Sequence, residues 1–146
     1  MPEYLTIYLH HLGYAILVAA LVLELFVLRP ELDAATARRL ALADLASGLA
    51  VMLMLVTGLL RVFAGSKPAA YYAQNWLFHL KVTLFVLIVG LAIYPTVRVV
   101  KQRRLAPGTR AAYPAAVRRL VAAELVLALL LPLLAVLMAR GYGYTG

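Results

Sequence analysis

The chain has 146 residues, of which 65% are hydrophobic, and its mean hydropathy of +0.92 excludes an ordinary soluble domain. Its formal net charge of +8 comes from basic residues gathered beside apolar runs, where membrane orientation and anionic lipid account for them without nucleic acid. The absence of cysteine excludes disulfides, thiolate metal sites and covalently attached haem, so a metal would need His, carboxylate or amine ligands.

Four apolar runs are each about as long as the twenty residues that a helix needs to cross a bilayer. In chain order they span residues 4–28, 40–63, 76–97 and 120–138. Asp33 can cap a helical lead-in to the second run, and the third is expected to end around Pro95. Pro132 lies inside the fourth, where neighbouring helices can satisfy the freed carbonyl. The pattern predicts an all-α, integral membrane four-helix bundle that forms one domain, residues 1–146.

The basic residues are distributed unequally between the two ends of these runs. Ten flank the first and third connections, whereas the other end has only Arg61, Lys67, Lys81 and Arg140. Because cytoplasmic loops are rich in Lys and Arg, both termini are expected on the outer side of a bacterial inner membrane.

All three histidines lie in two polar clusters that open the first and third runs: His10 and His11 in the first, and His79 with Lys81 in the third. The predicted topology places both clusters in the outer leaflet, where buried ionisable groups usually serve a site. By helical phase, His10 shares a face with Tyr14, whereas His11 points elsewhere. His79 and Lys81 are two residues apart, so they cannot both face one partner helix.

These residues suit a non-covalent haem b. A haem in a helical bundle needs inward-facing neutral imidazoles at matching depth, a small residue beside the macrocycle, and cations near its propionates. His10 or His11 together with His79 are the candidate metal ligands. Gly58 or Gly90 can provide clearance, and Arg61 or Lys67 can pair with the propionates. Lys81 can act as a ligand or as a proton donor.

Three acids occupy the opposite end of the runs, namely Glu24, Asp44 and Glu124. Either they pair with arginines near the inner surface, or they form a proton path. In the second run a stripe of small and polar residues, from Asp44 to Arg61, is expected to face the bundle interior.

Two resemblances rest on short motifs. Leu-His-His, Leu-Arg-Pro, Gly-Leu-Leu-Arg-Val-Phe, Ala-Tyr-Tyr, Tyr-Pro-Thr and the terminal Met-Ala-Arg-Gly-Tyr-Gly are similar to an uncharacterised bacterial four-span family over almost the whole chain. Tyr-Leu-x-x-x-Leu-His in the first run and Trp76 to Val82 in the third resemble the HemJ-type protoporphyrinogen IX oxidases and the related CopD-like membrane proteins.

The HemJ-like resemblance implies a bound haem b and a required histidine and lysine, here His10 or His11, and Lys81. It also implies a tetrapyrrole or a redox partner, and, if the chain is an enzyme, a membrane oxidoreductase. The chain differs from that family in its doubled histidine and in having Leu28-Arg29 where the family has a Tyr-His pair. The alternatives are a cofactor-free scaffold or small-molecule carrier, and a copper-handling protein that uses the three histidines. Besides the lipid bilayer, a second copy of the chain is an expected partner.

Overall fold

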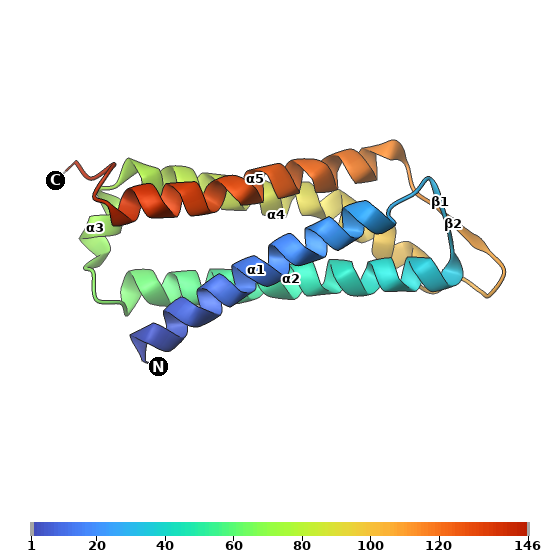
Figure 1. The fold of residues 1–146 in the computed structure, drawn as a ribbon, viewed down its shortest axis with the longest axis horizontal. Coiled ribbons are helices and arrows are strands. Elements are labelled where there is room, and N and C mark those ends of the chain that lie inside the picture. Colours follow the sequence, from blue (N-terminus) through green and yellow to red (C-terminus); the bar gives the residue numbers. More distant parts are fainter. Residues whose placement is uncertain (1, 146) are drawn as a thin grey trace.

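In the computed structural model, which describes residues 2–145, four long helices lie side by side in a bundle (Figure 1). These are α1 (Glu3–Val27), α2 (Ala34–Phe63), α4 (Trp76–Gln102) and α5 (Ala115–Ala139). All four are long and apolar enough to cross a membrane, which confirms the predicted all-α bundle. The N- and C-terminal ends lie at the same end of it (Figure 1).

The helix ends follow from local chemistry. Asp33 caps α2 by accepting hydrogen bonds from the backbone N–H groups of Ala35 and Thr36, both at 2.9 Å, as predicted. Asn75 caps α4 in the same way and is fully buried. The predicted lead-in is helical, so α2 begins at Ala34. Two helices extend further than predicted: α5 begins at Ala115, and α4 continues through Pro95 to Gln102. The expected end near Pro95 is therefore wrong.

Short elements connect the spans at both ends. At one end, strands β1 (Glu31–Asp33) and β2 (Arg110–Ala112) pair antiparallel, with Leu32 opposite Ala111. At the other end, the five-residue helix α3 (Ala69–Ala73) bridges α2 and α4. The hydropathy pattern predicted neither strand nor α3.

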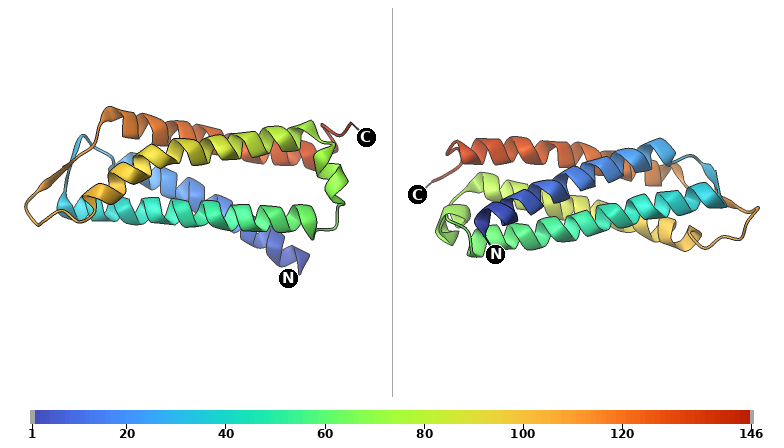
Figure 2. Two further views of the ribbon diagram at one scale, coloured as in Figure 1. Left: turned by 180° about the vertical axis from the view of Figure 1, so that it is seen from behind. Right: turned by 60° about the horizontal axis from the view of Figure 1, so that its bottom comes forward.

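The helices pack most closely as two hairpins, α1 with α2 and α4 with α5. Figure 2 shows the two hairpins converging toward the strands and separating toward α3, because α1 crosses from α2 to α5 along its length. The core runs through the converging part and includes Leu17, Leu21, Leu40, Ile88 and Val121. Large apolar side chains such as Leu49, Val86 and Leu129 stay exposed on the outside, as expected of a surface that faces lipid.

Candidate functional site

The diverging end of the bundle contains a cavity of about 800 Å³ between the two hairpins. Ligand pockets in proteins commonly span about 300–1,000 Å³. All four long helices and α3 contribute to its wall, and we call it the outer cavity because the predicted topology places it at the outer face. His10, His11, Tyr14, Arg61 and Lys81, all predicted site residues, line it.

His10 is held in one tautomer by α2. Its Nδ1 lies 2.9 Å from Oγ1 of Thr57, and the Thr57 hydroxyl lies 2.6 Å from the carbonyl oxygen of Leu53, to which it donates. Because a hydroxyl has one hydrogen, Nδ1 of a neutral His10 is the donor to Thr57, and its Nε2 retains a lone pair. The ring packs beside Gly58, where an added Cβ would lie 3.4 Å from Cε1 of His10, in ordinary van der Waals contact.

His11 has the same tautomer for a different reason. Its Nδ1 lies 2.7 Å from the carbonyl oxygen of Ile7, which can only accept, so Nδ1 carries the hydrogen and Nε2 of the neutral ring is basic. The two imidazoles meet nearly at right angles, with centroids 6.3 Å apart. His11 is exposed at the rim but still lines the outer cavity, so the expectation that it points elsewhere is wrong.

His79 lies outside this arrangement. Its Nε2 donates to the carbonyl oxygen of Ala73 at 2.9 Å, and it is not part of the cavity wall, whereas Lys81 is. The predicted divergence of the two residues is confirmed, and Lys81 faces the cavity. The expected pairing of His79 with His10 or His11 as metal ligands is wrong. Gly90 provides no clearance, because it is exposed on the outside of α4.

The polar part of the wall is mainly cationic. Arg61, Lys67 and Lys81 line it, and Nζ of Lys67 lies 4.0 Å from the centroid of the Tyr71 ring. Glu3 is the one carboxylate in the lining, and it accepts hydrogen bonds from the backbone N–H and the hydroxyl of Ser66, at 3.1 and 2.7 Å. Within residues 2–145, no carboxylate lies within ion-pair distance of these three cations. The arrangement favours a ligand with an apolar body and negative charge.

The converging half of the bundle has the opposite character. Glu24, Asp44 and Glu124 are buried there, on α1, α2 and α5. The one ion pair in residues 2–145 joins Arg110 and Glu31, so the expectation that the three acids pair with arginines is wrong. The stripe from Asp44 to Arg61 does face inward, as predicted.

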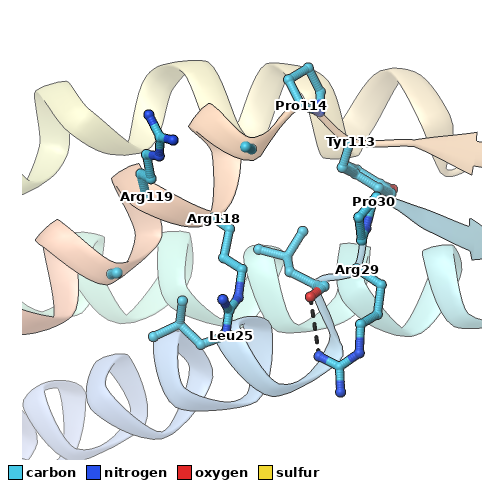
Figure 3. A pocket seen from close by; sticks show the side chains of 10 residues that line it. Leu25, Arg29, Pro30, Tyr113, Pro114, Arg118 and Arg119 are labelled. Carbon is cyan, nitrogen blue, oxygen red and sulfur yellow. Dashed lines mark hydrogen bonds between the residues drawn. The ribbon is translucent and has the colours of Figure 1, made fainter.

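A second cavity of about 660 Å³ opens near β1 and β2, between the end of α1 and the start of α5. We call it the inner cavity. In Figure 3, Arg118 points from α5 toward Leu25 of α1, Arg29 lies at the edge beside Pro30, and Arg119 points the other way. Tyr113 belongs to the wall, and burial raises the pKa of its phenol above the usual value.

In residues 2–145, no group of three or more His, Cys, Asp or Glu side chains is placed to hold a metal ion. A copper site built from the three histidines is therefore not formed. An axially ligated haem makes a different demand, because its iron is already held by four ring nitrogens and needs only one or two protein ligands. His10 and His11 both line the outer cavity, and each neutral ring keeps a lone pair on Nε2.

The fold and both cavities define a four-span helical membrane protein with ionisable groups inside the bundle. A model of the predicted membrane protein family DUF2214 matches residues 2–143, so the chain belongs to that family. The match confirms the predicted membership of a family of membrane proteins. No curated protein and no solved structure matches the chain.

Proposed function

We propose that the protein binds haem b in the outer cavity and acts in electron or proton transfer. The observation that carries this proposal is the pair of imidazoles, His10 and His11, each with Nδ1 engaged and Nε2 basic, in the wall of one large cavity. Metal-binding histidines usually donate their second ring nitrogen to an acceptor in this way, which fixes the tautomer and the ring orientation.

The other lining residues suit the same ligand. Arg61, Lys67 and Lys81 provide cations for two propionates, and Tyr14 contributes to the wall on the face that it shares with His10. When bound, haem supplies reversible one-electron exchange at its iron. His10 and His11 hold and orient the group, and Lys81 exchanges a proton beside it. The HemJ-like motif that contains Lys81 supports this role, although the comparisons match only the DUF2214 family.

This function requires partners and an orientation. The protein exchanges electrons with a redox partner, or handles a tetrapyrrole, at the outer face of a bacterial inner membrane, as a single chain or as a homo-oligomer. The ten basic residues at the strand end support this orientation, with both termini outside.

A second candidate is a carrier for an amphiphilic anion that uses the same cavity without iron. The excess of cations over carboxylates in the lining favours it. The two functions differ in what His10 and His11 do, since a carrier needs their charge or bulk and not their lone pairs.

Replacing His10, His11, His79 and Lys81 singly by alanine tests the proposal. Loss of an axial ligand shifts the Soret and reduced α bands or abolishes haem retention. We expect this for His10→Ala or His11→Ala, whereas His79→Ala, which removes a histidine outside the cavity, should match the parent. Identical spectra for all four variants would reject the haem site and leave the carrier.

A further inference from the structure

The four buried side-chain atoms without a hydrogen-bond partner in residues 2–145 all belong to the converging half of the bundle. They are Oε1 of Glu24, Oε1 of Glu124, the Tyr113 hydroxyl and Nε of Arg98. Buried polar atoms are almost always paired, by protein or by ordered water, so each orphan needs a partner outside the chain. Their grouping indicates one hydrated polar region.

Two of these atoms belong to buried carboxyl groups, and the other two belong to Tyr113 and Arg98. Glu24 lies within electrostatic range of both Asp44 and Glu124, and the Tyr113 phenol lies within range of Asp44 and Arg98. Glu24 and Glu124 are only 2% and 3% exposed, and Tyr113 is 5% exposed. The charged and titratable groups facing the region thus come from α1, α2, α4, α5 and the segment before α5.

Three ionised carboxylates in this setting would be strongly unfavourable. Each would lose its hydration and repel the other two, and within residues 2–145 none of the three is in an ion pair. Asp44 accepts a hydrogen bond from the Thr96 hydroxyl at 2.7 Å, whereas Oε1 of Glu24 and Oε1 of Glu124 have no donor. Protons on Glu24 and Glu124 remove the repulsion and turn each acid into a donor for water.

The inner cavity borders this polar region at Tyr113. Tyr113 is part of the wall of the inner cavity and is also within range of Asp44. Leu25 and Ala122, in the same wall, are close in sequence to Glu24 and Glu124. The acids themselves are not part of this wall, so Tyr113 is the residue that joins the inner cavity to the buried polar region.

We propose that Glu24, Asp44 and Glu124 form a proton-exchange site that takes up and releases protons through the inner cavity. Each step moves one proton between a carboxyl oxygen and cavity water, leaving a neutral acid or a carboxylate, and no metal ion takes part. The site is separate from the outer cavity and does not depend on haem binding there.

Infrared spectroscopy of the whole protein in vesicles at pH 7 tests the site directly. We expect a carbonyl stretch of protonated carboxylic acids that shifts in deuterated water, that weakens in Glu24→Gln and in Glu124→Gln, and that is lost in the double variant. Glu31→Gln, which removes an exposed acid, is the matched control and should leave the band unchanged. If a variant fails to fold, the presence of the carbonyl band in the wild-type protein and its shift in deuterated water still test the proposal.

The absence of the band at pH 7, or its survival in the double variant, would overturn the proposal. Exchanging choline for sodium at constant pH distinguishes protons from a metal cation. We expect no change, and loss of the band on adding sodium would assign the acids to cation binding instead.

Thiol labelling tests the route, since the chain has no cysteine of its own. A thiol reacts as its thiolate, which requires water. We expect a membrane-impermeant maleimide to label Ala122→Cys from the same face as Arg104→Cys in the connection between α4 and α5. Val126→Cys, exposed on the apolar outside, should not react. Failure of Ala122→Cys to react from that face would reject the inner cavity as the route.

Discussion

At the residue scale, the best-defined feature is the orientation of His10. The hydroxyl of Thr57 accepts from its Nδ1, and its ring packs beside Gly58. Both neighbours lie on α2, and neither is itself a metal-binding type of residue. The hydrogen bond to Thr57 therefore fixes which ring nitrogen of a neutral His10 keeps its lone pair, as the proposed haem site requires.

A residue-scale prediction concerns Asp33, the cap of α2. Hydrogen bonds from the backbone N–H and then the hydroxyl of Thr36 hold the pKa of its carboxyl below the usual value. A lowered folded-state pKa contributes stability above the unfolded pKa, about 4, that is lost as the pH falls through the folded value. We expect Asp33→Ala to lower the thermal midpoint in detergent at pH 7, and Asp33→Asn to retain most of it.

The pH dependence separates these variants further. Between pH 7 and about pH 3, the wild type should lose more stability than Asp33→Asn, because the amide has no proton to gain. An identical loss in both proteins would show that the ionised carboxylate contributes nothing to the cap.

Several site residues were predictable from the sequence, and others were not. His10, Tyr14 and Lys81 were found because ionisable or polar groups in a hydrophobic run are rare. His79 met the same criterion, but helical phase cannot tell which face of α4 meets the other hairpin. In the structure its Nε2 donates a hydrogen bond to the carbonyl oxygen of Ala73. Thr57 could not be recognised as a site residue from the sequence, since the hydroxyl of a threonine in a span usually donates a hydrogen bond to a carbonyl of its own helix.

At the element scale, hydropathy located the four spans and most of their ends, but it missed the end of α4 and the start of α5 beside β1 and β2. The polar ends of α2, α4 and α5 lie beyond the hydrocarbon-length runs. Asp33 caps α2 there, whereas Pro114, the N-cap of α5, makes no side-chain hydrogen bond. The pairing of β1 with β2 joins segments far apart in the sequence, so no local pattern predicts it. The cap Asn75 explains why α4 begins at Trp76, as predicted.

An element-scale prediction concerns Gly143, which holds the C-terminal segment against the start of α4. Its φ is +81°, and a Cβ there would lie 2.6 Å from Oδ1 of Asn75 and 2.8 Å from Cγ of Leu77. We expect Gly143→Ala to lower the free energy of unfolding by about 1–3 kcal/mol, because both the backbone and the buried cap must shift. Denaturant unfolding in detergent measures the change.

Gly90→Ala is the control, because that helical glycine has no atom within 4 Å of an added Cβ. It should be neutral or stabilising by up to about 1 kcal/mol. Equal stability of the Gly143→Ala protein and the wild type would show that the C-terminal segment does not support α4.

At the scale of the whole molecule, charge is divided along the bundle axis. Cations line the diverging half, and acids occupy the converging half. The division separates the proposed haem site from the proposed proton-exchange site. The positions of the charged residues in the four runs predicted this division of charge. The outer cavity was not predicted, because the separation of the hairpins depends on how α1 crosses the bundle (Figure 2).

The orientation of the molecule is a prediction at this scale. Because both termini lie at the end opposite the basic connections, a reporter fused after Gly146 should be exported, and one inserted at Gly108 should stay in the cytoplasm. Paired fusions to alkaline phosphatase and a fluorescent protein measure this. A cytoplasmic signal after Gly146 would reverse the orientation of both cavities.

The absorption spectrum of the purified whole protein, oxidised and then reduced with dithionite, tests the central claim most directly. After growth with added haem precursor, we predict a Soret band and a reduced α band typical of a non-covalent b-type haem. A preparation that folds correctly but shows no Soret band after such growth would contradict the haem site.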